Sequence, residues 1–512
     1  MQTKRHHISA LTYQWVRGVV LPVFAWARKI SGDVRHGSGL SCPKNHHRVR
    51  GGIGSGLIIL LVVLPNCLLG EIAASQSSDD NPTLTIHTPV SHQDLSADEV
   101  IEALLASPEW TVECTPEESA NRDALLASVR RMTGEARYVA ARLLERLPLT
   151  YTKTFTKEYD QAFSYMTDGS ITPERREQPR LVPDHLSMDV EIFEDTVNLA
   201  LQARNELPWC AELDMDVFIR YVVVHRGTTE TLENWRAHFW YNESLRDRVQ
   251  HYADQYREAA YRQERSRVIR QLVYYLNTEY LANEVSYEPR GMPDLSPNEL
   301  MAQGTGRCTD LTNALMAICR TFGLAVAGVR TIWWPRSDSN HFWAAIYDPA
   351  ADEWLDVDGA DGGEYSDAYF QVGRRGDEIH AKLYWLDMDA VRGSIRQMLA
   401  NDAHPTPIEH YLVELAQVDM TERYTPVGRI EQQTSLEYGT PAYLCVFNSG
   451  MWREVAATRV DDGGRIVFDN VGCRSGVLYL VRYNDPETGA PVPIGRPGVL
   501  RANAEGAEWT VY

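Results

Sequence analysis

The sequence is poor in cysteine and lacks the short motifs that mark common metal and phosphate sites. Only 8 cysteines occur among 512 residues, and no two of them form a CxxC pair. The zinc-protease motif HExxH is missing too, which disfavours a structural or protease-type zinc site. The phosphate-binding loop GxxxxGK[ST] is also absent. We therefore expect the protein to work without a metal or a cofactor.

Positive charge is scarce as well. Lys and Arg number 50 against 70 Asp and Glu, which gives a formal net charge of -20. Nucleic-acid-binding proteins usually carry a basic surface, so this class is disfavoured, and small molecules, proteins or glycans remain as partners. The composition is otherwise globular, 44% hydrophobic and 23% charged, and the length suggests roughly two to four domains.

The longest apolar run lies near the N-terminus. Residues 51–70, GGIGSGLIILLVVLPNCLLG, carry no charge and follow the basic stretch KNHHRVR. This pattern is typical of a secretory signal, with AAS at 73–75 as the cleavage site. Its apolar part is shorter than the roughly 20 residues of a membrane helix, but membrane anchoring through 51–70 stays open. We expect an extracytoplasmic protein that is secreted, periplasmic or membrane-anchored.

Export would permit disulfides. Cys445 and Cys473 lie in the same C-terminal segment and form one candidate pair, and Cys114 with Cys210 forms another. The sequence alone does not fix the connectivity.

The chain divides into segments of different pattern. Helix-start signals recur after the polar N-terminal stretch, among them the capping box SADE at 96–99 and TPEE at 115–118. Short stretches rich in β-branched and aromatic residues begin near 324 and dominate again after 425. The predicted segments are an N-terminal extension with the signal or anchor (1–75), a linker (76–95), a helical region (96–264), a core (265–400) and a β-sandwich (425–512).

One cysteine lies at the start of a predicted helix. In GTGRCTDLTNALMAICRTFG, residues 304–323, Cys308 follows two glycines and precedes apolar residues at three- and four-residue spacing. Gly323 is placed to end this helix. The unpaired N–H groups at a helix N-terminus favour an anion, so a thiolate there has a lowered pKa and is the reactive form. Cys308 is a candidate nucleophile, with a buried structural thiol or a disulfide as the plain alternatives.

A thiol nucleophile needs a base and a group that orients the base. In SDSNHFWAAIYDPAADEWLDVDGADG, residues 337–362, His341 begins a strand, DPAAD forms a turn and Asp358 ends the next strand. Counting inward from His341 and Asp358 meets near residue 350, so an antiparallel hairpin would place them roughly opposite each other. A different loop length would shift the register and favour Asp356, on the same face.

The order of these elements resembles the transglutaminase-like superfamily, in which a Cys opens a helix, a His starts a later strand and an Asp closes the next one. The matching pieces are GRCTDLTNALMAICRTFGLAVAGVR, HFWAAI and EWLDVDG, within roughly residues 265–390. The aromatic Trp343, two after the His, is typical of the family. So is Trp354, four before the Asp, and this spacing selects Asp358 over Asp356. The resemblance implies an α+β fold with a papain/transglutaminase-like core, a helical N-terminal region and a C-terminal antiparallel β-sandwich.

The resemblance also implies a chemistry. His341 would take the proton of Cys308, Asp358 would orient the imidazole, and the thiolate would attack an amide or peptide bond to give a thioester. The thioester would pass to water or to an amine, as in a cysteine hydrolase or acyltransferase with a protein, peptide or glycopeptide substrate. The Cys308 backbone N–H is a natural oxyanion donor. The candidates for a second donor are Gln303, Trp333 and Trp334, and because the two tryptophans adjoin on one predicted strand, at most one of them lines a cleft.

Two other functions stay open on the sequence. A catalytically silent transglutaminase-like module could bind peptide or glycan, with the β-sandwich as its recognition domain. The acidic cluster at 356–367 loosely resembles a calcium loop and would suit a surface adhesion protein, although it lacks the EF-hand pattern. We interpret Asp310, two residues after Cys308, as a first-turn carboxylate that complements the helix dipole.

Overall fold

The structure of the protein is a computed structural model. It describes residues 96–512 apart from 108–109, 113, 155–179, 290–293, 336–339, 361–381, 383, 387–416, 449, 474–476, 504–505 and 512. All of these lie in the second of the two units, Met1–Thr85 and Ile86–Tyr512, into which the chain divides. The predicted extension, signal or anchor and linker (1–95) fall outside the described residues. Across the part of the chain that the structure describes, every helix is too short or too polar to cross a membrane.

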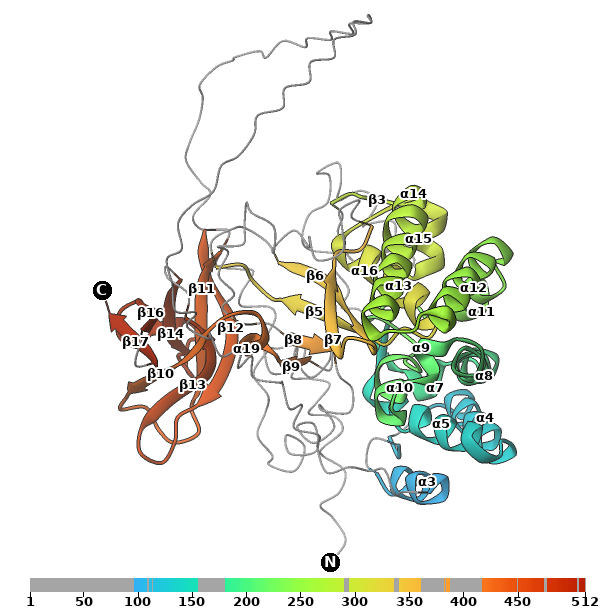
Figure 1. The fold of residues 1–512 in the computed structure, drawn as a ribbon. Coiled ribbons are helices and arrows are strands. Elements are labelled where there is room, and N and C mark those ends of the chain that lie inside the picture. The colour runs from blue at the N-terminus through green and yellow to red at the C-terminus, as the bar shows by residue number, and fades with distance from the viewer. Residues whose placement is uncertain are drawn as a thin grey trace, which may run out of the picture. The chain divides into compact units, whose positions relative to one another are not determined.

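Helices fill the first described part of the chain (Figure 1). Ser96 caps the first helix through a capping box, and Pro116 stands at the start of the second, as the sequence predicts; Thr115 caps that second helix through a further capping box. Two short strands, β1 (Tyr151–Thr154) and β2 (Arg180–Pro183), pair antiparallel within this region, which the sequence did not predict. The helices are α3 (Ala97–Leu105), α4 (Pro116–Arg131), α5 (Gly134–Leu144), η2 (Leu147–Leu149), α7 (Asp184–Ser187), α8 (Val190–Glu206), α9 (Pro208–Ala211), α10 (Met215–Tyr221), α11 (Trp235–Trp240) and α12 (Glu243–Glu258).

A mixed core follows. Its five-stranded sheet has the order β7-β6-β5-β8-β9, with every neighbouring pair antiparallel. The strands are β5 (Val326–Thr331), β6 (His341–Asp348), β7 (Glu353–Val357), β8 (Tyr384–Leu386) and β9 (Gln417–Asp419). Helix α16 (Cys308–Thr321) packs on β5 and β6 (Figure 1). The remaining elements are α13 (Arg262–Tyr274), the π-helix η4 (Tyr275–Leu281), α14 (Ala282–Glu284), β3 (Ser286–Tyr287), α15 (Pro297–Gln303) and β4 (Thr305–Gly306).

Helix α16 begins and ends where the sequence predicts. Its residues from Thr309 to Thr321 are all buried, so the helix is enclosed by the core rather than half exposed. Gly323 adopts a left-handed φ of 70° just beyond the helix. Its N–H donates to Arg320 O and the N–H of Leu324 donates to Cys319 O, which is the Schellman pattern that a glycine in this conformation completes.

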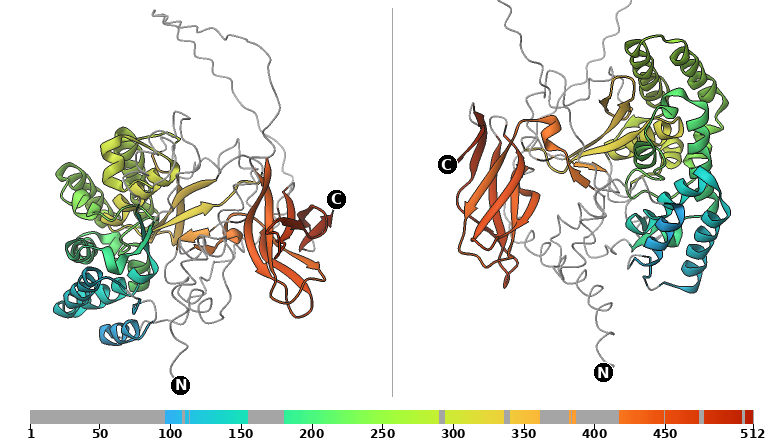
Figure 2. Two further views of the ribbon diagram at one scale, coloured as in Figure 1. Left: turned by 180° about the vertical axis from the view of Figure 1, so that it is seen from behind. Right: turned by 60° about the horizontal axis from the view of Figure 1, so that its bottom comes forward.

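The C-terminal strands form two antiparallel sheets around one apolar core, which confirms the predicted sandwich (Figure 2). One sheet pairs β10 with β13, and the other has the order β12-β11-β14-β16-β17, with β15 beside β14. The short helix α19 (Thr421–Tyr424) precedes them. The strands are β10 (Val427–Gln433), β11 (Pro441–Asn448), β12 (Met451–Arg459), β13 (Arg465–Gly472), β14 (Leu478–Asn484), β15 (Pro491–Pro493), β16 (Gly498–Asn503) and β17 (Gly506–Val511).

The candidate disulfides are not formed. Cys114, Cys210, Cys308, Cys319, Cys445 and Cys473 are all free thiols. Cys473 lies in the core between the two sheets, whereas Cys445 belongs to a separate apolar cluster with Ile332 and Tyr384 of the preceding core. The two sulfurs therefore belong to different packing layers, although both lie in one segment of the sequence.

Candidate functional site

Cys308 is the first residue of α16, and its half-buried side chain is hydrogen-bonded to the imidazole of His341. The backbone N–H of Phe342 also donates to its sulfur. Burial alone would raise the pKa of this thiol. The hydrogen bond and charge of His341, the Phe342 N–H and the more distant charge of Arg330 outweigh burial, so the pKa of Cys308 is lowered.

His341 is the first residue of β6, and its Nε2 lies 2.6 Å from Oδ1 of Asp358. Burial lowers the pKa of His341, but the hydrogen bonds to Asp358 and Cys308 and their charges raise it to about 10. Because Nε2 faces the carboxylate, Nδ1 is the nitrogen left to face the sulfur. The geometry therefore favours a thiolate beside an imidazolium that Asp358 holds in place.

The register of the hairpin differs from the predicted one. Ala344 pairs with Val357 and Ala345 with Asp356, so continuing the same register puts Asp358 opposite Trp343 rather than opposite His341. His341 and Asp358 are diagonal neighbours on one face of the sheet, a separation that long side chains can bridge. Asp356 is not a partner of the imidazole, because it accepts from the indole N–H of Trp343 at 2.9 Å.

Two features that the sequence analysis missed fix the backbone around Asp358. Asn277 of the π-helix η4 donates to Asp358 O at 2.9 Å and accepts from Ala360 N–H at 2.8 Å. Gly359 lies between them, and a Cβ there would come within 2.6 Å of the Leu311 backbone in α16. Short π-helical segments are frequent at functional sites, but the spacing of residues in the sequence does not predict where one will form.

Tryptophan side chains flank the imidazole. Trp343 stacks on His341 with ring centroids 5.7 Å apart and an interplanar angle of 24°. Trp334 stacks on it at 6.2 Å and 27°. Both indoles are buried, so they limit the rotation of the ring and exclude water from it.

The three candidates for the second oxyanion donor lie in different places. The exposed side chain of Gln303 donates to Thr305 O at 3.0 Å. Trp333 packs against the sandwich, with the Arg453 guanidinium 4.7 Å from its ring centroid. Both tryptophans follow the end of β5 at Thr331 instead of lying on the strand, and of the three candidates Trp334 is the one that stacks on the imidazole.

The residue before the nucleophile is anchored by carboxylates. Asp310 is fully buried and accepts from the backbone N–H of Arg307 at 2.9 Å and from that of Leu295 at 2.8 Å. The Arg307 side chain pairs with Asp294 and Asp310. Asp310 thus caps the first turn and fixes the chain that leads into Cys308, a wider role than complementing the dipole.

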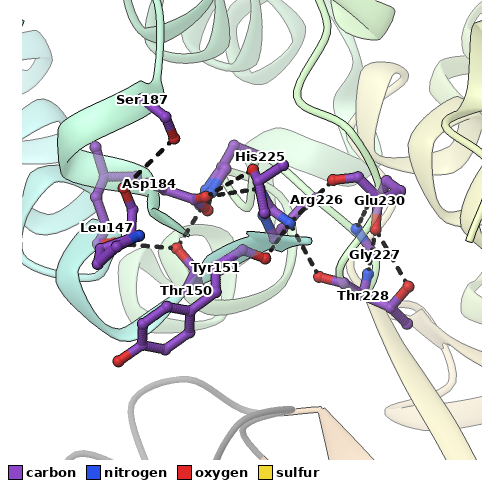
Figure 3. Close-up of polar contacts among 12 residues, drawn as sticks. Leu147, Thr150, Tyr151, Asp184, Ser187, His225, Arg226, Gly227, Thr228 and Glu230 are labelled. Atoms are coloured by element: carbon purple, nitrogen blue, oxygen red, sulfur yellow. Dashed lines mark hydrogen bonds and ion pairs between the residues drawn. The ribbon is translucent and has the colours of Figure 1, made fainter. Parts of the chain in front are cut away.

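A second buried polar cluster lies within the helical region (Figure 3). Asp184 of α7 accepts from Arg226 Nη2 at 2.7 Å, and its other oxygen lies 2.8 Å from Nε2 of His225. The Arg226 guanidinium also donates to Tyr151 O at 2.8 Å. The side chains of Asp184, His225 and Arg226 are almost completely buried. Their hydrogen bonds offset the cost of removing these charges from water.

The loop that follows Arg226, residues 227–230, connects this cluster to α16. Glu230 accepts from the backbone N–H groups of Gly227 and Thr228 at 2.6 and 2.7 Å, which closes the loop (Figure 3). The Thr228 hydroxyl donates to Asp294 at 2.8 Å and accepts from Asn313 of α16 at 3.0 Å. The polar run HRGTTE directly after the apolar stretch VVV is the signal in the sequence that could have marked this loop.

The acidic cluster proposed for calcium is divided between partners. Asp356 contacts Trp343, and Asp358 contacts His341. Among the residues that the structure describes, no group of three or more His, Cys, Asp or Glu could hold a metal ion. The rest of the cluster, from Asp361 to Asp367, lies outside the described residues.

Part of the core matches a known protein family. The family model of the transglutaminase-like superfamily matches residues 250–359, a stretch that contains Cys308, His341 and Asp358. Among solved structures, the transglutaminase of red sea bream is similar at 10% identity over 51% of this chain and 60% of its own, which is less than two thirds of its length. The TM-score of 0.21 is too low to bear on the fold. A search of curated proteins gives no match. The family model supports the resemblance found in the sequence, over residues 250–359.

Proposed function

We propose that the protein is a cysteine acyl-transfer enzyme, with Cys308 as nucleophile, His341 as proton carrier and Asp358 as the orienting carboxylate. The observation that carries this proposal is the hydrogen-bonded line from Cys308 through His341 to Asp358 at the start of α16. Its support is the lowered pKa of Cys308 at the N-terminus of a helix, which favours the thiolate, the reactive form of the side chain.

The first half of the reaction uses both members of the ion pair between the Cys308 thiolate and the His341 imidazolium. The Cys308 thiolate attacks an amide or peptide carbonyl carbon, and a C–S bond forms while the carbonyl oxygen becomes an oxyanion. The His341 imidazolium gives its proton to the leaving nitrogen as the C–N bond breaks, which leaves a thioester and a free amine or ammonia. Asp358 stabilises the imidazolium until that transfer.

The second half restores the thiolate. Neutral His341 takes a proton from water or from a primary amine, which attacks the thioester carbon and expels Cys308. The backbone N–H of Cys308 is the first oxyanion donor in this proposal. Trp334 is the second, because its ring lies against His341 whereas Gln303 is exposed and Trp333 contacts Arg453.

The substrate we propose is a protein, peptide or glycopeptide that the enzyme meets outside the cytoplasm. The support for export is the uncharged stretch 51–70 behind its basic flank. Fusion of residues 1–95 to a reporter that is active only after export would test this part. An inactive reporter would contradict export without bearing on the chemistry.

Alkylation of the full-length protein with iodoacetamide at pH 6 tests the nucleophile. Cys114 is a matched internal control, because it is free and half-buried like Cys308. The lowered pKa of Cys308 increases its thiolate fraction at this pH, so Cys308 should react faster than Cys114, by about tenfold for each pH unit of lowering. His341→Ala should abolish the difference. If Cys308 and Cys114 of the unsubstituted protein were alkylated at equal rates, the proposed enzymatic function would be refuted.

Ammonia release from a glutamine-containing peptide, with and without an added primary amine, then separates the two outcomes of the thioester. Incorporation of the amine indicates acyl transfer, and release without incorporation indicates hydrolysis. A Cys308 that is unreactive in a protein that still binds peptide would support the alternative, a catalytically silent binding module.

A further inference from the structure

A buried carboxylate, Asp356, lies on the same face of the hairpin as Asp358, two residue pairs closer to the turn. His341, Trp343 and Ala345 alternate onto one face of β6, and Asp356 of β7 pairs with Ala345. The indole of Trp343, which is 0% exposed, stacks on His341 and donates its N–H to Asp356 Oδ1 at 2.9 Å. Asp356 therefore fixes the plane of a ring that touches the imidazole.

The same carboxylate collects donors from a distant part of the chain. The Tyr424 hydroxyl of α19 donates to Asp356 Oδ1 at 2.8 Å, and Arg423 Nη2 lies 3.5 Å from Oδ2. Arg423 also donates to Trp354 O at 2.9 Å. The Tyr424 ring meets the Trp343 indole edge-on, with centroids 5.8 Å apart and an interplanar angle of 89°. The indole is therefore contacted both at its N–H, by Asp356, and by the Tyr424 ring.

Burying a carboxylate in a protein core is energetically unfavourable. Removing it from water is unfavourable unless hydrogen bonds and a counter-charge offset the loss of hydration. An apolar residue at position 356 would avoid this cost, but it would leave the indole N–H and the Tyr424 hydroxyl without this acceptor. Two of the donors that Asp356 collects are the Trp343 indole itself, which stacks on His341, and the Tyr424 hydroxyl, whose ring packs against that indole.

We propose that Asp356 is a positioning residue which, through the Trp343 indole and with the support of Tyr424, holds the His341 imidazole in its hydrogen bond with Cys308. This inference rests on the proposed function, since it assigns a role within the same site. It also places α19, outside the segment 250–359, in the support of that site.

The test is the pH dependence of Cys308 alkylation in the full-length protein. Trp343→Phe keeps an aromatic ring against His341 but removes the N–H that Asp356 accepts. Tyr424→Phe removes the hydroxyl, and Asp356→Asn keeps the shape while removing the charge. In each variant we expect the inflection of the rate to move toward that of an ordinary thiol, by about one pH unit or tenfold in rate at pH 6 for Trp343→Phe.

The same hairpin supplies a matched control. The Tyr347 hydroxyl donates to Asp352 at 2.6 Å near the turn, at the opposite end from His341. Tyr347→Phe removes one tyrosine hydroxyl from one aspartate, as Tyr424→Phe does, and its pH profile should match that of the unsubstituted protein. Circular dichroism and the free energy of unfolding show whether each variant is folded, and Tyr424→Phe stays informative if Asp356→Asn does not fold.

The possible failures are distinguishable. If Cys308 of the unsubstituted protein reacts like an ordinary thiol, the proposed function is refuted and this inference with it. If Cys308 reacts fast at pH 6 and Trp343→Phe, Tyr424→Phe and Tyr347→Phe all keep the unsubstituted profile, the role of Asp356 is refuted while the proposed function stands.

Discussion

At the scale of single residues, His341 is held on every side that the structure describes. Asp358 contacts one ring nitrogen, Cys308 the other, and the indoles of Trp334 and Trp343 stack on the ring. Such a ring has little freedom to rotate. Its protonation state is therefore set by fixed neighbours rather than by water, which is how a pKa near 10 arises in a histidine.

The sign of this shift predicts the effect of Asp358→Asn. The pKa of His341 is raised from 6.5 to about 10, so its proton is retained through neutral pH and is lost only as the pH approaches 10. Without the carboxylate, burial would pull this pKa down again, and the imidazolium that stabilises the thiolate would disappear at a lower pH. We expect Cys308 alkylation to be slower near neutral pH and to rise only toward the range of an ordinary thiol.

A series of alkylation rates from pH 5 to 10 checks this prediction. Asp352→Asn is the control, because Asp352 lies in the turn of the same hairpin and is exposed. The unsubstituted protein and the control should share a flat profile across neutral pH. Identical profiles for Asp358→Asn and the control would contradict an ion pair between Cys308 and His341.

At the scale of elements, the site depends on the contact between η4, α16 and the end of β7. Asn277 contributes both polar atoms of its amide to the backbone on either side of Gly359. Gly359 itself allows that backbone to touch α16. Asp358 is therefore placed by a helix that precedes the nucleophile in the sequence, not by the hairpin alone.

Asn277→Ala should destabilise the protein and disturb the site together. It leaves the buried Asp358 carbonyl and the Ala360 N–H without these partners, which costs about 1–3 kcal/mol in the free energy of unfolding. The matched control is Asn283→Ala. Asn283 is exposed, and its side-chain amide donates a local hydrogen bond to Glu279 O, one turn earlier in the same helical stretch. That control should stay within about 0.5 kcal/mol.

Denaturant unfolding gives the free energies, and the Cys308 alkylation rate at pH 6 reports on Asp358. We expect Asn277→Ala to slow alkylation while Asn283→Ala leaves it unchanged. A destabilised Asn277→Ala protein that alkylates at the full rate would show that Asp358 keeps its place without Asn277.

The sequence predicts those parts of the molecule that depend on local signals. The cap at Ser96, the proline that opens the second helix and the terminator at Gly323 follow from residue type and spacing, and all three are confirmed. The elements that carry Cys308, His341 and Asp358 follow from periodicity together with a family pattern.

What the sequence did not predict depends on contacts between distant segments. The hairpin register differs from the predicted one by two residues, because Asp348 pairs with Glu353 and the turn is therefore centred between residues 350 and 351 rather than between 349 and 350. Three other features arise from tertiary contacts, which produce no periodic pattern of apolar residues in the sequence. They are the π-helix with Asn277, strand β9 at the edge of the core sheet, and the loop at Gly227–Glu230.

At the scale of the whole described chain, residues after the family segment take part in the core. Strand β9 extends the core sheet beside β8, although the predicted segments left it between the core and the sandwich. Lys382 contacts both Asp419 of β9 and Asp469 O of β13. The Tyr384 hydroxyl of β8 donates to Val455 O of β12 at 2.7 Å. The sandwich is thus bonded directly to the sheet that carries His341.

The contact nearest the site is that of Asn448, at the end of β11. Its buried amide donates to Trp334 O at 2.8 Å, and the Trp334 ring stacks on His341. Asn448→Ala should lower the free energy of unfolding by about 1 kcal/mol and, because it loosens the segment that carries Trp334, slow Cys308 alkylation at pH 6. Asn484→Ala, a half-buried asparagine on β14 of the same sheet, is the control and should change neither quantity. If Asn448→Ala loses stability but keeps the full alkylation rate, the sandwich supports the fold without supporting the site; a loss of both shows that the C-terminal strands hold the imidazole in place through Trp334.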